Sequence, residues 1–296
     1  MSPRLLHAWS RGIDKRLVAP RVVLFDWHAT LVDTLDAMYH AVDDMLPRLP
    51  ELGLVERLVP PGRGRSREDA RLVEYVRKHL RLHPKIKAAR RISRTDIYEV
   101  LFGADEDAKR IAHHAFNDCY RQHYGEVHPF EGDERDMLLE LREFNLRLGI
   151  LTNRNREFLE HELAMIEGGS WVGLFDTTVC GDDTARHKPA PDPVLRALAN
   201  LGVAPGRDCW YVGDSTTDVV CANRAGITSV FFNGAGWDEA WLDTIFPGTD
   251  EHPHRPAVVV DSFREFVLLY ERILHISNED RHRALEHAYT QFGRPA

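Results

Sequence analysis

Cysteine and long apolar runs are both scarce in this chain of 296 residues. Its four cysteines include no CxxC pair or other metal-type spacing, so we expect reduced, buried thiols in a cytoplasmic protein rather than a disulfide framework. No run of about 18 apolar residues occurs, which excludes a transmembrane helix and argues against a membrane partner. Residues 1–21 carry five Lys or Arg but no apolar core, so we expect no secretory signal.

Positive charge is in the minority, because 38 Lys and Arg face 46 Asp and Glu and the net charge is −8. This acidic balance argues against a protein that binds nucleic acid with its whole surface. Residues 62–94 are the exception, since twelve Lys or Arg there face three acids. This basic segment contains a single aromatic residue, Tyr75, which is too few for a stacking platform that binds single-stranded nucleic acid.

Six short apolar runs, rich in β-branched and aromatic residues, are typical of buried parallel strands. The segments between them have apolar residues at helical spacing, and Gly202 and Gly226 are stop signals for two of these helices. Strands that alternate with helices predict an α/β fold with a parallel sheet covered on both faces. The predicted strands are 21–26, 147–152, 177–181, 209–214, 228–232 and 257–260, and the predicted helices are 134–146, 193–202 and 217–226.

A long helical stretch interrupts this alternation after the first strand. At about 150 residues per domain, the chain length of 296 predicts two domains or one large domain with an insertion. Because the helical stretch separates the first strand from the second, we predict a discontinuous α/β core of residues 1–34 and 129–296, with a helical domain inserted at 35–128. After Asp261 we expect one or two packed helices, followed by a loose tail over 291–296.

Four polar signals follow the predicted core elements in order. Each one alone is typical of a helix cap or a turn. Together they indicate one site, because ligands of parallel sheets bind at the carboxyl ends of the strands. The four signals are Asp26-Trp27-His28-Ala29-Thr30, Thr152-Asn153, Lys188 and Gly213-Asp214-Ser215-Thr216-Thr217-Asp218.

The residue types in this set suit the transfer of a phosphoryl group. Asp26 and Asp214 at adjacent strand ends would repel each other unless a cation neutralised them. Oxygen ligands combined with several waters are what Mg²⁺ prefers. Thr152 and Lys188 supply a hydroxyl and a fixed positive charge that offset the charge of the transferred group. Asp26 then keeps one carboxylate oxygen for attack, which would form an aspartyl-phosphate.

These motifs resemble those of the haloacid dehalogenase-like hydrolase superfamily, in its phosphoglycolate-phosphatase-like branch with a helical cap after the first motif. The match covers most of the α/β part, whereas the inserted domain is similar only in being helical. The resemblance implies a Rossmann-like core with an α-helical cap domain and a hydrolase activity. The matching segments are 25–34, 130–154, 187–198 and 212–227.

The resemblance also implies a role for each site residue. Asp26 is the implied nucleophile and a metal ligand, and Asp214 is a second ligand of Mg²⁺. Thr152 and Lys188 are implied to bind the phosphoryl group. The remaining positions are Asn153, an adjacent phosphate contact, and Asp218, which supports the metal site or orients Lys188.

His28 is the position at which the sequence departs from the superfamily. Its phosphatases carry Asp two residues after the nucleophile, as general acid and base. The backbone carbonyl of this residue, which the family uses as a metal ligand, survives any change of side chain. An imidazole has an unperturbed pKa near 6.5, so His28 can in principle protonate a leaving alkoxide and later activate water. We expect slower turnover, because its reach differs from that of Asp.

The sequence therefore predicts a Mg²⁺-dependent phosphatase that hydrolyses a small anionic phosphorylated metabolite. A binding or regulatory protein with weakened catalysis is the alternative that His28 raises. A phosphonate hydrolase is a further alternative, since that branch also has an Asp-Trp pair, but Lys78, Lys85 and Lys87 do not match its cap lysine motif. Asp214 argues against a haloacid dehalogenase, because dehalogenases lack an acidic metal site.

Two interpretations of the basic segment 62–94 stay open. It is a solvated, arginine-rich helix face, or some of its arginines face the active site and bind a second anionic group of the substrate. The sixteen histidines are scattered, and we interpret pairs such as His79 and His83 as surface residues rather than zinc ligands. The inserted domain carries no motif that names a substrate, and the sequence carries none that indicates an oligomeric state.

Overall fold

The computed structural model describes residues 17–60, 63, 66–89, 94–123 and 125–276. The chain forms two compact units. The α/β core contains the residues up to Val32 and those from Pro129 onward, and Asp33–His128 form the second unit, called the insertion below. The first boundary thus lies after Val32 rather than after residue 34. The expected tail over 291–296 and most of the N-terminal stretch 1–21 lie outside the described residues.

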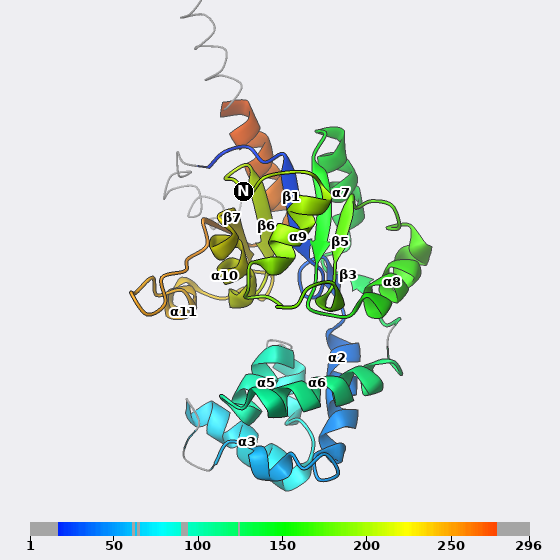
Figure 1. Cartoon of the computed structure of the whole chain (residues 1–296), viewed down its shortest axis with the longest axis vertical. Helices are drawn as coiled ribbons and strands as arrows, with labels where there is room; N and C mark the ends of the chain where they lie inside the picture. Colours follow the sequence, from blue (N-terminus) through cyan, green and yellow to red (C-terminus); the bar gives the residue numbers. More distant parts are fainter. Residues whose placement is uncertain (1–16, 61–62, 64–65, 90–93, 124, 277–296) are drawn as a thin grey trace, which may run out of the picture. The chain divides into compact units, whose positions relative to one another are not determined.

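The α/β core is built on a six-stranded parallel sheet, with the strand order β5-β4-β1-β6-β7-β8 (Figure 1). All six strands predicted from the sequence are present to within two residues, which confirms the Rossmann-like α/β fold. Short apolar runs suffice here because a parallel strand is buried on both faces. The strands are β1 (Val22–Asp26), β4 (Arg147–Leu151), β5 (Thr177–Val179), β6 (Cys209–Gly213), β7 (Thr228–Phe232) and β8 (Val258–Val260).

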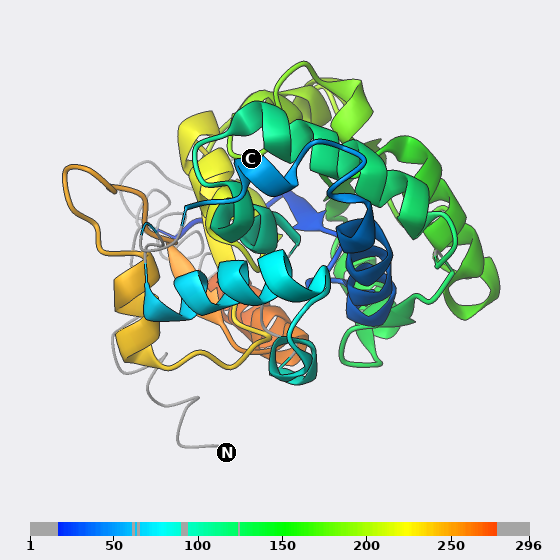
Figure 2. The same cartoon turned by 90° about the horizontal axis from the view of Figure 1, so that it is seen from below.

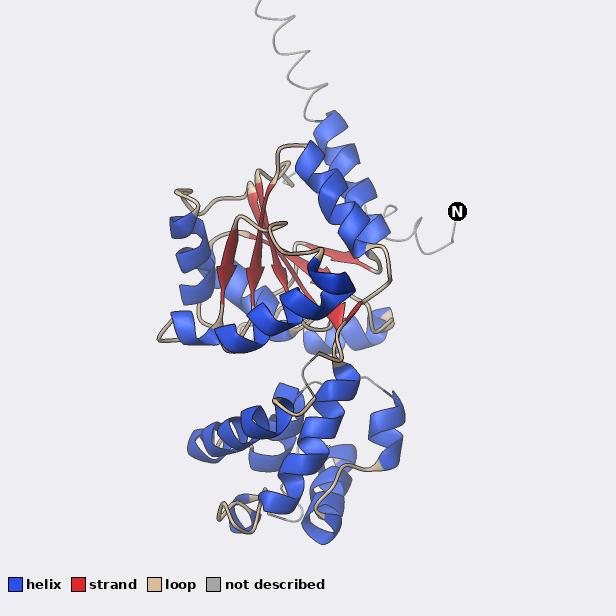
Figure 3. Ribbon diagram, turned by 90° about the vertical axis from the view of Figure 1, so that its right-hand side faces the viewer, coloured by secondary structure: helices blue, strands red, loops and turns tan. Residues whose placement is uncertain are grey.

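Helices cover both faces of this sheet, as Figure 3 shows. On one face, Val22 and Leu24 of β1 pack with apolar residues of α9 and α10. On the other face, Phe25 contacts the rings of Phe263 and Phe266 in the helical residues 263–276. The core helices are α7 (Glu134–Glu143), α8 (Arg156–Met165), α9 (Asp192–Asn200), α10 (Thr216–Ala225) and α11 (Glu239–Ile245), with short 3-10 turns at Ile166–Gly169 and Gly181–Asp183.

Between β2 (Val32–Asp33) and β3 (His128–Pro129), the described residues of the insertion form helices joined by loops, and α2 packs against α6 (Figure 2). Where the chain leaves the core and returns to it, β2 pairs with β3. Among the described residues of the whole chain, no helix is both long and apolar enough to cross a membrane. The helices of the insertion are α2 (Leu35–Met45), α3 (Arg67–His79), α4 (Pro84–Ala89), α5 (Arg94–Phe102) and α6 (Glu106–Tyr120), with 3-10 turns at Leu46–Arg48 and Val55–Arg57.

We predict that Phe266→Ala destabilises the core by about 3–5 kcal/mol, because it leaves a cavity under the sheet. The Phe266 ring is fully buried and lies 5.9 Å from the Phe25 ring and 6.1 Å from the Trp210 ring. Urea unfolding measures the loss. Trp241, which is 46% exposed, provides the control, since Trp241→Ala should change the unfolding free energy by less than about 1 kcal/mol. Equal losses in the two variants would contradict the prediction.

Candidate active site

Three neighbouring strands bring the predicted site residues to one edge of the sheet. β1 lies between β4 and β6, and Asp26 at the end of β1 is in register with Leu151 of β4. Thr152 therefore follows β4 beside Asp26, and Asp214 follows β6 on the other side of it. This placement follows from parallel pairing, because the carboxyl ends of parallel strands meet at the same edge.

The Asp26 carboxylate is held at the strand end by two contacts. Its Oδ1 accepts a hydrogen bond of 2.8 Å from the backbone N–H of Trp27. The same oxygen lies 2.7 Å from Nζ of Lys188. Burial raises the pKa of Asp26 to about 6, because the attraction of Lys188 only partly offsets the loss of water and Asp218 adds repulsion.

The buried ammonium of Lys188 joins Asp26 to Asp218. Its Nζ lies 2.8 Å from Oδ1 of Asp218 and donates a hydrogen bond of 2.9 Å to the hydroxyl of Tyr211. Burial alone would lower the pKa of Lys188, but Asp218 and Asp26 outweigh it and raise the pKa above its usual range. Lys188 is therefore a fixed positive charge at the strand edge, which is the property that phosphoryl binding requires.

Two residues that follow β4 fix the backbone around this lysine. The side-chain amide of Asn153 donates to the carbonyl of Lys188 at 3.1 Å, and its carbonyl oxygen accepts from the Lys188 N–H at 3.0 Å. The side chain of Asn153, the residue expected to be an adjacent phosphate contact, is thus paired with the Lys188 backbone. The buried Thr152 hydroxyl accepts a hydrogen bond of 3.1 Å from the Arg154 N–H, which orients its Oγ1.

The start of α10 positions Asp218. Its carboxylate accepts from the backbone N–H of Ser215, while the Ser215 hydroxyl faces the Asp218 N–H, which together form a capping box. Tyr211 donates its hydroxyl to Oδ1 of Asp218 at 2.9 Å. A Cβ at Gly213 would lie 2.5 Å from Cγ of Asp218, so only glycine lets β6 approach this carboxylate so closely. Asp218 is therefore placed to orient Lys188.

The donor set at this edge fits a divalent cation. Carboxylate oxygens of Asp26, Asp214 and Asp218 all lie within 4.8 Å of one another. Burial, followed by repulsion from Asp26 and Asp218, raises the pKa of Asp214 well above its usual range. Three ionised carboxylates and the ammonium of Lys188 have a net charge of −2, which a divalent cation would neutralise. All-oxygen donors of this kind suit Mg²⁺.

His28 lies beside a buried carboxylate from α8. Its Nε2 is 3.0 Å from Oε2 of Glu162 and 3.4 Å from Oε1. The indole Nε1–H of Trp27 donates to the same Oε2 at 2.7 Å. Glu162 is fully buried, so its carboxylate orients the His28 ring.

Sequence reasoning missed Glu162 and Tyr211. Glu162 sits four residues after Phe158, on the buried stripe of α8 that also includes Leu159. A charged residue at an apolar-stripe position is the signal that could have revealed it. Tyr211 lies in the middle of β6 and looks like an ordinary strand aromatic until its hydroxyl is placed against Lys188 and Asp218.

Part of the basic segment is bound within the insertion itself. Arg77 donates to the carbonyl oxygens of Val55 at 3.2 Å and Leu58 at 3.1 Å. Lys87 pairs with Asp43 at 2.5 Å. These contacts assign Arg77 and Lys87 to the packing of the insertion rather than to ligand binding.

We predict that Asp26 makes the metal-free protein less stable as the pH rises. The ordinary pKa of an aspartate, which applies to Asp26 in the unfolded chain, is 3.8, whereas the pKa of Asp26 is about 6 in the folded chain. Between these pH values the folded state keeps a proton that the unfolded state has lost. The unfolding free energy therefore falls as the pH rises through this window. Urea unfolding in EDTA should show a flatter pH profile for Asp26→Asn than for the unchanged chain.

Asp243, whose side chain is 62% exposed, provides the matched substitution for this experiment. Asp243→Asn should keep the slope of the unchanged chain. Parallel profiles for Asp26→Asn and Asp243→Asn would show that the Asp26 carboxyl does not carry the effect.

The sequence of the chain is similar to those of known proteins. The model of the haloacid dehalogenase-like hydrolase family matches residues 72–232. The phosphoglycolate phosphatase of Escherichia coli (strain K12) is 30% identical over 217 residues, which cover 71% of this chain and 80% of that protein. A putative pyrophosphatase PpaX of Caldanaerobacter subterraneus is 34% identical over 115 residues, or 39% of this chain, and the match spans about half of that protein, 49%.

Solved structures agree with the fold. The crystal structure of a putative phosphoglycolate phosphatase from Lactobacillus plantarum aligns with a TM-score of 0.58 at 20% identity, over 85% of this chain and 100% of that one. A putative haloacid dehalogenase-like hydrolase from Bacteroides fragilis aligns with a TM-score of 0.57 at 18% identity, over 82% and 97% of the two chains. The chain belongs to the haloacid dehalogenase-like hydrolase family, in its phosphoglycolate-phosphatase-like branch.

Proposed function

We propose that the protein is a Mg²⁺-dependent phosphatase that hydrolyses a small phosphorylated metabolite through an aspartyl-phosphate. The observation that carries this proposal is the convergence of three carboxylates, Asp26, Asp214 and Asp218, around a strand edge that also holds the ammonium of Lys188. The carboxylates would hold the cation, which offsets the negative charge of the phosphoryl oxygens.

The four buried cysteines form no disulfides, which fits the reducing cytoplasm.

In the first step, a carboxylate oxygen of Asp26 attacks phosphorus and the bond to the leaving oxygen breaks. Oδ1 of Asp26 is occupied by Trp27 and Lys188, so we assign the attack to Oδ2. Lys188 and the Thr152 hydroxyl stabilise the charge on the phosphoryl oxygens as it is transferred. His28, oriented by Glu162, donates the proton that the leaving alkoxide needs.

In the second step, a water molecule attacks the phosphorus of the aspartyl-phosphate. His28 accepts a proton from this water, and the acyl–phosphate bond breaks. Inorganic phosphate is released and the free Asp26 carboxylate is restored. Glu162 keeps the ring in the same orientation for both steps, because its carboxylate contacts Nε2. The names of two relatives make phosphoglycolate and pyrophosphate the first substrates to test.

We predict that Asp26→Asn lowers phosphatase activity at least about 1,000-fold, since it removes the nucleophile. Initial rates with phosphoglycolate and p-nitrophenyl phosphate, with Mg²⁺ and with EDTA, provide the measurement. The exposed Asp243→Asn is the control and should keep full activity. Activity that survives EDTA, or that Asp26→Asn retains, would contradict the proposed mechanism.

We predict that His28→Ala slows the hydrolysis of alkyl phosphates more than that of p-nitrophenyl phosphate, whose leaving group needs little protonation. Glu162→Gln should show the same selectivity with a smaller loss, because it leaves the imidazole in place but loosens its orientation. Glu160→Gln, on the same helix with a side chain that is 66% exposed, should change neither rate. Equal losses on both substrates would reject proton transfer by His28.

A binding or regulatory role with weakened catalysis is the second candidate. It is favoured by His28 itself, because one nitrogen of the ring is taken up by Glu162 and the carboxylate usual in the superfamily is replaced. This role requires a phosphorylated ligand that binds tightly, with negligible turnover across a broad set of phosphate esters and phosphonates. Turnover of any metabolite at an ordinary enzymatic rate would remove it.

A further inference from the structure

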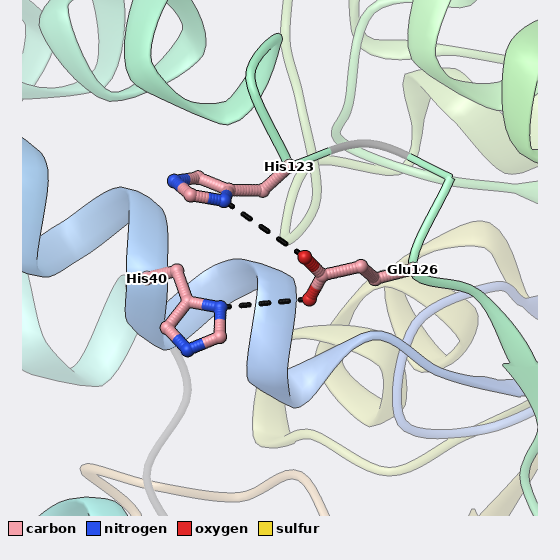
Figure 4. Close-up of side chains that lie close together, drawn as sticks. All are labelled: His40, His123 and Glu126. Carbon is pink, nitrogen blue, oxygen red and sulfur yellow. Dashed lines mark ion pairs between the residues drawn. The ribbon is translucent and has the colours of Figure 1, made fainter.

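A second group of metal-ligand side chains lies wholly within the insertion. His40 projects from α2, and His123 and Glu126 belong to the segment that follows α6, with the carboxylate facing both rings (Figure 4). We propose that these three side chains bind a divalent transition-metal ion of the Zn²⁺ class, at a site separate from the aspartates of the core. The proposal is independent of the phosphatase function.

The spacing of the donor atoms suits coordination to a shared ion. Nδ1 of His40 lies 3.5 Å from Oε2 of Glu126, and Nδ1 of His123 lies 3.9 Å from Oε1. Both separations exceed a good hydrogen bond, which ends near 3.2 Å. Metal bonds of about 2.0–2.1 Å set ligand atoms about 3.4 Å apart on a tetrahedron, so small side-chain adjustments bring the three donors to one ion.

Asp44 supplies the outer support that metal-binding histidines usually have. Its Oδ2 lies 2.7 Å from Nε2 of His123. A proton on Nε2 then leaves Nδ1, the nitrogen that faces Glu126, with a lone pair for the metal. Asp44 and His40 are four residues apart on α2, so the same helix carries one ligand and the carboxylate that orients another.

The donor types and their exposure favour a different ion from the one expected in the core. Two imidazoles and one carboxylate suit Zn²⁺, Co²⁺, Ni²⁺ or Cu²⁺, whereas the three core aspartates suit Mg²⁺. The side chains of His40 and Glu126 are 50% and 47% exposed, and that of His123 is 22% exposed. An ion can therefore enter from solvent, and water completes its coordination.

The position of the ligands in the chain gives the site a structural role. α2 is the first helix after Asp33, and Glu126 lies two residues before His128, where the insertion ends. An ion bound here would join the beginning of the insertion to its end. Because it binds the folded insertion and not the unfolded chain, the ion should raise the melting temperature of the protein.

Cobalt provides a test that does not depend on catalysis. The full chain, stripped with EDTA, is titrated with Co²⁺ while its visible absorption is recorded. We expect intense d–d bands, typical of a site of low coordination number, that reach their maximum at one equivalent of Co²⁺. Added Zn²⁺ should abolish these bands. His40→Ala and His123→Ala should lose these bands, and Asp44→Asn should weaken Co²⁺ binding about 10- to 100-fold.

Three controls distinguish this site from the core aspartates and from binding by a nearby histidine. His79→Ala removes another histidine of the insertion, whose ring packs on Tyr75, and should leave the bands unchanged. Asp214→Asn disables the core cluster and should also leave them unchanged. In the Asp214→Asn background, which removes the core cluster as a competing site, Zn²⁺ should raise the melting temperature, but not once His40→Ala is added. Bands that vanish in Asp214→Asn and persist in His40→Ala, or no bands in the unchanged chain, would overturn the proposal.

Discussion

The ammonium of Lys188 lies between the carboxylates of Asp26 and Asp218, and the geometry of the whole strand edge depends on this buried contact. A buried ammonium without carboxylates, or buried carboxylates without a cation, would be strongly destabilising. The backbone of the lysine is therefore fixed by Asn153, and its head group by Tyr211. These contacts hold the edge that we propose receives a phosphoryl group in place before a ligand arrives, as electrostatic catalysis requires.

The strands and the polar residues that end them could be predicted from the sequence, because both are local features. The apolar residues of a run such as 21–26 indicate a buried strand. The order of the parallel strands then places Asp26, Thr152 and Asp214 together. The contact of His28 with Glu162 could not be predicted in this way, because Glu162 lies within α8 and not at the end of a strand. Nor could the pairing of the Asn153 side chain with the Lys188 backbone, which joins two loops of the chain.

In the proposed mechanism, His28 and Glu162 together take the role that the sequence comparison with the superfamily assigns to a single carboxylate. An Asp at this position would carry the proton on a short side chain, whereas an imidazole is longer and must be held by a neighbour to keep one orientation. The fully buried Glu162 does this, and it also accepts from the Trp27 indole. The substitution therefore involves a helix, α8, as well as the loop after β1.

The central position of β1 has a consequence for how the chain acquires its fold. Its two partners, β4 and β6, are paired with Val22 at Arg147 and Cys209, so neither exists until the insertion has been synthesised. This strand is buried along its whole length in the folded chain, but it has no sheet partner while Asp33–His128 are being synthesised. The insertion is therefore synthesised before the residues that cover the edges of β1, and until then the open edges of this strand are a site for pairing with other chains.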